Sequence, residues 1–172
     1  TAQVAALTAG QIAMLGTEQI IALTAAQAAV LKTSQIAALT SEQLAVMETR
    51  DLVVLRTAGI SALDATQLGV ISTAGFAALT TSQISALKTS QMSSLGTDQI
   101  GALQTAQAAA LSSSQVAALT TDQIGGLQTD ELAVLRTLAI QALATSLVAV
   151  LDTNQVAALT TAQVSALTTR QI

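Results

Sequence analysis

The chain repeats itself every eight residues from its first residue to its last, without an insertion or a deletion. Segments such as 121–127 (Thr-Asp-Gln-Ile-Gly-Gly-Leu) and 153–159 (Thr-Asn-Gln-Val-Ala-Ala-Leu) are near-copies. We number the octad positions so that Thr8 is at position one, Gln11 at position four and Leu15 at position eight. A fixed period of this kind indicates a solenoid, because one unit cannot bury its apolar face alone and stacked neighbours must complete the core.

Each octad position has a characteristic residue type. Position eight is Leu except at Met47 and Ile71, and position five is always apolar, so we expect these two positions to form a continuous core. Position four is Gln in 16 of 22 octads and position two is Thr in 17 of 22. A buried polar group repeated at a fixed height needs a repeated partner, so we expect Thr to cap its own octad and Gln to bond to backbone. Positions one and three take almost any residue and carry nearly all the charge, which predicts the solvated face.

The octad is incompatible with one unbroken helix. Eight residues at about 100° each leave equivalent positions about 80° apart, so the Leu stripe would wind around the rod. Each octad instead resembles the start of a new helix, because segments such as 39–44 (Leu-Thr-Ser-Glu-Gln-Leu) match a capping box flanked by a hydrophobic staple. Where position one is Lys32, Gly96 or Arg136, the Thr at position two is an alternative cap, which leaves the helix start open by one residue.

These features predict an all-α solenoid of about 21 short helical octads. The alternative is a β-solenoid, because Thr, Ile and Val suit strands and alternation would place positions five and seven on one face. Ala dominates positions six and seven and the chain has no Pro, which favours the helical interpretation. We expect residues 1–172 to form a single continuous repeat array. Because Thr1 and Ile172 both lie inside an octad, we also expect the array to be a piece of a longer one.

A slower period of 80 residues, or ten octads, overlies the octad. Departures from the consensus recur at this offset: Asp51 pairs with Glu131, Arg56 with Arg136, and Gly59 with Ala139. One explanation is tandem duplication of an 80-residue block. The other is that ten octads complete a whole number of superhelical turns, which would align the exceptional residues along one side. In that case the four charged residues Asp51, Arg56, Glu131 and Arg136 form a candidate interaction strip.

The charged residues do not suggest a reaction. Glu48 and Asp51 alternate with Arg50 and Arg56, which predicts a solvated ion-pair face and not a set of convergent carboxylates. Gly59 lies outside any Gly-rich phosphate loop, as does Gly75, and we interpret both as local relief where Gln is not accommodated.

Composition excludes most chemistry. The chain has no His, Cys, Trp, Tyr or Pro, which rules out zinc fingers, thiol nucleophiles and imidazole bases. We therefore predict no catalytic residue, no metal site and no cofactor, and do not expect an enzyme. A net charge of -4 provides no positive surface for a phosphate backbone, so nucleic acid is not an expected partner. The apolar run 147–151 is far shorter than the ~20 residues that span a bilayer, so we predict no transmembrane segment.

The recurring phrase Leu-Thr-x-x-Gln-Val/Ile-x-Ala-Leu carries two resemblances. It resembles the first helix of transcription-activator-like effector repeats, but over only about eight residues. The second helix, the base-reading loop and the basic stripe of that family are absent, so its DNA recognition is not carried over. Along the whole chain the phrase is similar to octad tracts of very large bacterial repeat proteins, which are adhesin-like or labelled as surface or haem-utilisation proteins.

The second resemblance implies a secreted or cell-surface location and a stalk-like role. The haem label does not transfer, because this chain lacks the His, Cys and Tyr that usually ligate haem. The expected function is a structural module, serving as spacer, stalk or scaffold of a larger bacterial protein. The alternative is a module that binds a protein or a surface through the exceptional octads 48–79 and 128–151. Self-association through the ends of the solenoid is a further expectation; the sequence identifies no other partner.

Overall fold

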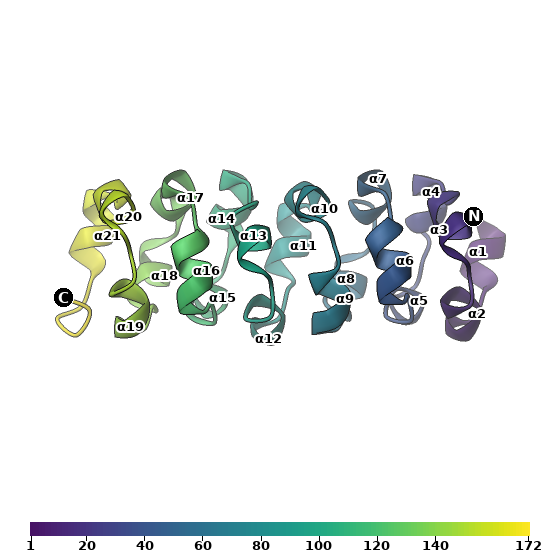
Figure 1. The fold of residues 1–172 in the computed structure, drawn as a ribbon, viewed down its shortest axis with the longest axis horizontal. Coiled ribbons are helices and arrows are strands. Elements are labelled where there is room, and N and C mark those ends of the chain that lie inside the picture. Colours follow the sequence, from purple (N-terminus) through teal and green to yellow (C-terminus); the bar gives the residue numbers. More distant parts are fainter. The chain divides into compact units, whose positions relative to one another are not determined.

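The structure is a computed structural model that describes residues 1–172. It contains 21 α-helices of four to six residues and no strand (Figure 1), which confirms the helical solenoid and excludes the β-solenoid. The chain divides into two compact units, Thr1–Leu87 and Lys88–Ile172. The division falls between two octads, so the octad register runs through it unchanged.

The two units are built from the same kind of element. The helices of the first unit are α1 (Ala2–Ala6), α2 (Ala9–Ala13), α3 (Thr17–Ile21), α4 (Ala25–Ala28), α5 (Thr33–Ile36), α6 (Ser41–Val46), α7 (Thr49–Leu52), α8 (Thr57–Ile60), α9 (Ala65–Gly69), α10 (Thr73–Ala78) and α11 (Thr81–Ser85). The helices of the second unit are α12 (Thr89–Met92), α13 (Thr97–Ile100), α14 (Thr105–Ala110), α15 (Ser113–Ala117), α16 (Thr121–Gly126), α17 (Thr129–Val134), α18 (Thr137–Gln141), α19 (Thr145–Val148), α20 (Thr153–Ala158) and α21 (Thr161–Ala166).

Most helices start at a complete or partial capping box, and each helix stops within one octad. In α6, the Thr40 hydroxyl accepts a hydrogen bond from the Gln43 N–H at 3.2 Å, and Gln43 Oε1 accepts one from the Thr40 N–H at 2.8 Å. The helix ends at Met47, whose φ of -67° and ψ of 129° are extended. Because the next position-one residue is extended too, the chain changes direction before the next helix begins.

From α2 onward, the N-cap that the sequence left open is the residue at position one. Lys32 and Gly96 have no capping side-chain oxygen, yet both are extended N-caps, with ψ of 158° and 152°. The glutamine arm of the capping box is retained at these sites, and the Lys32 N–H donates to Gln35 Oε1 at 2.7 Å. Arg136 is also the N-cap of its helix. The Thr at position two therefore does not replace the cap.

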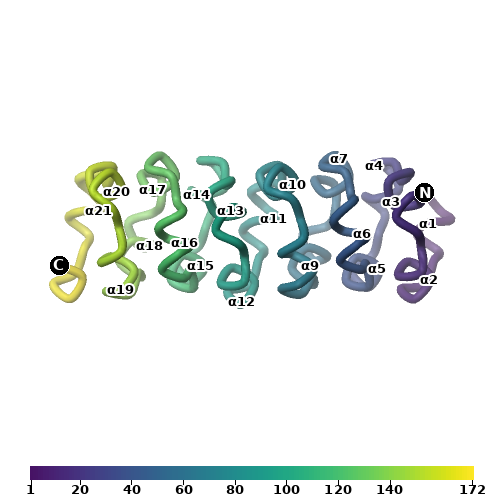
Figure 2. The backbone as a smooth tube through the Cα atoms, viewed as in Figure 1, coloured from purple at the N-terminus to yellow at the C-terminus, as the bar shows by residue number.

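Helices three octads apart pack against each other and form three rows in each unit (Figure 2). In the first unit the rows are α2–α5–α8–α11, α3–α6–α9 and α4–α7–α10. In the second unit they are α12–α15–α18–α21, α13–α16–α19 and α14–α17–α20. Each unit is thus a coil whose successive turns stack on one another.

Positions five and eight fill the interior, as the sequence predicts. Ile36 and Leu39 are 0% and 1% exposed, and the single aromatic residue, Phe76, is 0% exposed. Close packing also uses small residues where backbones meet. A Cβ on Gly101 would lie 2.9 Å from the carbonyl oxygen of Gly126, so this contact between the C-cap of α13 and α16 requires glycine.

Candidate functional site

The glutamine at position four joins successive turns of the coil. Gln83 shows the pattern: its Oε1 accepts from the Thr80 N–H at 2.8 Å within its own octad. Its Nε2 donates to the carbonyl oxygens of Leu52 and Leu55, both at 2.9 Å, which lie four octads earlier. One buried amide therefore closes a helix start and binds two carbonyls on the preceding turn, and leaves few of its own hydrogen-bonding groups unpaired.

This arrangement recurs in both units, and we call it the amide ladder. Its members donate to carbonyls 28 and 30 or 31 residues earlier, and they include Gln35, Gln43, Gln67, Gln83, Gln123, Gln155, Gln163 and Gln171. The predicted roles of position four are thereby confirmed. The acceptors lie on an octad that is distant in sequence and adjacent in space.

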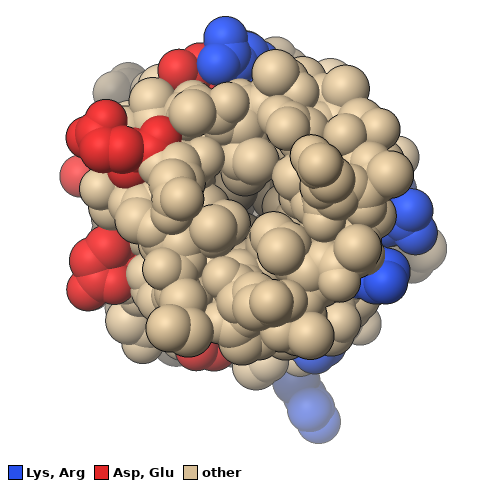
Figure 3. Space-filling view, turned by 90° about the vertical axis from the view of Figure 1, so that its right-hand side faces the viewer, with Lys and Arg blue, Asp and Glu red and all other residues tan.

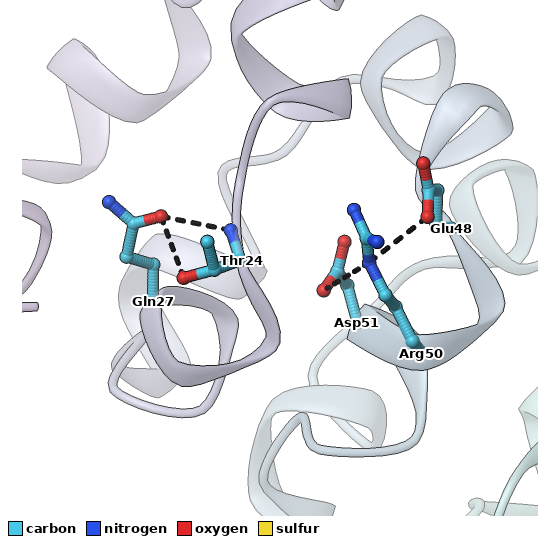
Figure 4. Close-up of polar contacts among 5 residues, drawn as sticks. All are labelled: Thr24, Gln27, Glu48, Arg50 and Asp51. Atoms are coloured by element: carbon cyan, nitrogen blue, oxygen red, sulfur yellow. Dashed lines mark hydrogen bonds and ion pairs between the residues drawn. The ribbon is translucent and has the colours of Figure 1, made fainter.

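Asp51 occupies a ladder position in α7 but makes no ladder bond. Its side chain is 0% exposed, and both carboxylate oxygens are buried without a hydrogen-bond partner. The Arg50 Nε lies 3.8 Å from Asp51 Oδ1 and 3.0 Å from Glu48 Oε2 (Figure 4). Figure 4 also shows an intact glutamine arm, in which Gln27 Oε1 accepts from the Thr24 N–H at 2.9 Å.

The chemistry of Asp51 follows from its length and burial. Aspartate is one methylene shorter than glutamine, and the side chain of the Glu48 N-cap accepts no capping hydrogen bond from α7. Burial raises the pKa of Asp51, which the Arg50 guanidinium lowers in part and the Glu48 carboxylate raises further.

Glu131 occupies the same position in α17, one 80-residue period later. Its Oε2 accepts from the Gln128 N–H at 2.7 Å, so it keeps the arm of the capping box that glutamine supplies elsewhere. The residue is 3% exposed, and burial raises its pKa to about 7. The hydrogen bond from Gln128 lowers this pKa and the Asp130 carboxylate raises it, but desolvation has the largest effect.

Burial of these two carboxylates corrects one prediction from sequence. Asp51 was expected on a solvated ion-pair face, yet it lies inside because position four is buried throughout the middle of each unit. The strip residues that do reach the surface are Arg56 and Arg136. Arg136 also has a packing role, because its Nη2 donates to the Leu111 carbonyl oxygen at 2.9 Å on the preceding turn. Alignment of the strip across the two units stays a prediction.

The glycines at position four replace amide bonding by apolar packing. At Gly59, the Ile36 side chain fills the space that a Cβ would need. At Gly75, a Cβ would lie 2.9 Å from Leu52 Cδ1. These contacts support the interpretation that both glycines provide local relief where Gln is absent.

No pocket opens on either unit, and no three His, Cys, Asp or Glu side chains cluster as metal ligands would. None of the helices has the length and apolar character needed to cross a bilayer. The polar features that the structure does display are the amide ladder and two buried carboxylates whose pKa values burial raises. The sequence signal for those carboxylates was their place in the glutamine column.

Comparison with known families agrees with the repeat geometry. The family model of the ALTTAQ repeat matches residues 44–81, 71–105 and 95–129, which together span half of the chain. The chain belongs to the ALTTAQ repeat family. In the octad numbering, the six letters of that name run from position seven to position four, and residues 158–163 of this ALTTAQ array carry them unchanged. No curated protein and no solved structure matches the array.

Proposed function

We propose that this ALTTAQ array is a non-enzymatic structural module, a spacer, stalk or scaffold, within a larger bacterial protein that is secreted or held at the cell surface. The amide ladder is the observation that supports this role most strongly. Each new turn binds the preceding turn through the same side chain, as Gln43 and Gln163 do in the two units. Octads can therefore be added without a new kind of contact, which is what a spacer of adjustable length requires.

The distribution of variable residues also supports a structural role. Positions four, five and eight are constrained by the ladder and the core, whereas positions one and three face solvent and vary freely. Such a surface tolerates substitution without loss of the scaffold. The bacterial and extracellular part of the proposal is supported by the resemblance to octad tracts of large bacterial surface proteins.

Small-angle X-ray scattering tests the spacer role. A second copy of residues 8–87, which is ten complete octads, is inserted after Leu87, and the maximum dimension of this chain is compared with that of the original. We expect the dimension to grow in proportion to the octads added. An unchanged dimension would contradict a spacer. A matched insertion of four residues at the same place should lower the melting temperature instead, because it breaks the register of the ladder.

Location needs a separate test on the bacterium that produces the array. Intact cells are treated with a protease that does not enter them, and the array is detected with an antibody before and after treatment. We expect the array to be degraded while a cytoplasmic control protein survives. Survival of both proteins would refute a surface location.

One observation favours the alternative role as a binding module. Val134, Leu138 and Val150 are 37%, 66% and 41% exposed, and all three lie in the exceptional octads 128–151. The test measures adsorption of the labelled array to the surface of the producing cells. Loss of adsorption in a Val134→Ser/Leu138→Ser variant, but not in a Met14→Ser control, would support this role. Met14 is a suitable control because it is 86% exposed and lies outside those octads.

A further inference from the structure

Asp51 is an exception to the way this chain places its charges. On the face of the molecule that Figure 3 shows, charged side chains lie near the edge and none lies at the centre. The Asp51 side chain is instead 0% exposed, and neither of its carboxylate oxygens has a hydrogen-bond partner. A buried carboxylate without hydrogen bonds is unfavourable unless a positive charge compensates it. The groups around Asp51 therefore show what it can bind.

The neighbouring guanidinium compensates this charge only in part. Arg50 Nε lies 3.8 Å from Asp51 Oδ1, beyond hydrogen-bond distance, and 3.0 Å from Glu48 Oε2. The Arg50 side chain is also 58% exposed, so water screens its charge. Two carboxylates and one guanidinium leave this group with one negative charge. One further positive charge would make the group neutral.

The amide ladder identifies what lies opposite Asp51. A ladder glutamine binds carbonyls 31 and 28 residues earlier, as Gln83 does, so position 51 corresponds to the carbonyls of Ile20 and Leu23. Helix α7 packs on α4, and the Asp51 carboxylate lies on the side of α7 that faces the chain at Thr24 (Figure 4). Ionised aspartate has no donor to offer these carbonyls. Carboxylate and carbonyl oxygens therefore face each other between two turns of the coil.

The length of aspartate sets the separation of these oxygens. Gln83 Nε2 lies 2.9 Å from each of its two carbonyl oxygens. Aspartate lacks one methylene, which places its carboxylate about 1.5 Å further away, at roughly 4.4 Å from the carbonyl oxygens. A hard cation binds oxygens at about 2.3 to 2.6 Å and so bridges oxygens about 4 to 5 Å apart. Glu131 has the length of glutamine and leaves no such separation in α17.

We propose that Asp51 and the carbonyl oxygens of Ile20 and Leu23 bind a sodium ion between two turns of the first unit. The ligands are all oxygens, which hard cations prefer. A monovalent ion neutralises the group that Asp51 forms with Glu48 and Arg50, whereas a divalent ion would leave a buried positive charge. Sodium has nearly the radius of calcium and fits the separation, but potassium is larger.

The ion would link the two turns where the ladder amide is missing. Composition did not indicate this site, because two of its three ligand groups are backbone carbonyls. The site lies among interior octads and does not depend on the proposed spacer role.

Thermal melting in sodium chloride and in tetramethylammonium chloride tests the proposal, at pH 8 and equal ionic strength. Tetramethylammonium is too large to enter the site. We expect the parent to melt about 3 °C higher in the sodium salt, the shift for an ion present at roughly ten times its Kd. Asp51→Gln restores the ladder donor and should lose this difference. Comparing the two proteins removes the general effect of each salt.

Two further variants separate the site from charge and from burial alone. Asp51→Glu keeps the charge but closes the separation, so it should also lose the sodium response. Glu131→Gln changes the other buried carboxylate and should retain the response. The sodium NMR signal should broaden with the parent and not with Asp51→Gln. Equal melting of the parent in the two salts, or a sodium response in Asp51→Gln or Asp51→Glu as large as that of the parent, would overturn the proposal.

Discussion

Replacing Glu131 by Gln should stabilise the second unit above neutral pH and leave it almost unchanged in acid. The reason lies in the amide ladder. A glutamine at position 131 would donate to the carbonyls of Ile100 and Leu103, which lie 31 and 28 residues earlier. A protonated Glu131 can donate one such bond. An ionised Glu131 has no donor, so its carboxylate oxygens would face the two carbonyl oxygens without a hydrogen bond. No other charge compensates, because α14 and α20, which pack on α17, contain no ionisable side chain.

The size of the effect follows from the pKa of Glu131. Burial raises this pKa from 4.5 to about 7. Each unit of pKa corresponds to about 1.36 kcal/mol, so ionisation costs the folded state about 3 kcal/mol. Below pH 4.5 the folded and unfolded chains are both protonated, and the residue costs nothing. As the pH rises from 4.5 to 7, only the unfolded chain releases its proton, so the free energy of unfolding falls, and above pH 7 the loss is complete.

Urea denaturation followed by circular dichroism measures this dependence. The free energy of unfolding of Glu131→Gln should exceed that of the parent by about 3 kcal/mol at pH 8, and match it within about 1 kcal/mol at pH 4. Using the difference between the two proteins removes the contribution of the other acids, including Asp51, whose pKa is also raised by burial.

The reverse substitution provides a matched control. Gln123 donates to the Met92 and Leu95 carbonyl oxygens at 2.9 and 2.6 Å in the same unit. Gln123→Glu should therefore lose stability between pH 5 and pH 8, by an amount similar to that which Glu131→Gln gains. The reasoning fails if Glu131→Gln is no more stable than the parent at pH 8, or if its advantage persists at pH 4.

Three further predictions follow from the same packing. Leu103→Ala should lower the free energy of unfolding by about 2 to 5 kcal/mol, because Leu103 is 4% exposed, whereas exposed Gln104→Ala should change it little; similar losses would contradict the assignment of inside and outside. Gln83→Ala should cost about 2 to 4 kcal/mol because two buried carbonyls lose their donor, and Gln19→Ala, which has no such acceptors, should cost less than half as much. Arrays of five, ten and twenty octads should show rising denaturation midpoints, and midpoints independent of length would argue against nearest-neighbour stacking.

The local half of this structure was predictable because it is set within one octad. Leu39, Thr40, Gln43 and Leu44 lie within six residues of one another, and their order specifies a capped helix start flanked by apolar contacts. The repetition strengthened each of these predictions, because every octad is an independent example of the same local geometry. The division into core and solvated positions followed from the same pattern.

The longer-range half was not predictable, because it depends on how far the chain advances in each turn. That advance is the sum of small rotations at the extended residues between helices, which no single octad specifies. The sequence therefore indicated that Gln43 needs a backbone partner, but not that the partner is Leu15. For the same reason the burial of Asp51 and Glu131 was not predicted. Their charge suggested that they are exposed to solvent, although they occupy position four, where the buried glutamines of the amide ladder lie.

The contacts between turns now sharpen the meaning of the 80-residue period. Hydrogen bonds between successive turns join residues 25 to 31 apart, as in Arg136 with Leu111 and Gln35 with Val4. If ten octads complete whole turns, three turns of about 27 residues fit this range, whereas two turns of 40 residues or four of 20 do not. A crystal structure of the whole chain should then place Arg56 on the same side of the coil as Arg136. If the two arginines point in unrelated directions, duplication remains the explanation of the 80-residue period. If they align, one face of the coil is formed by two segments that are separate in the sequence, and selection on that face can act on both.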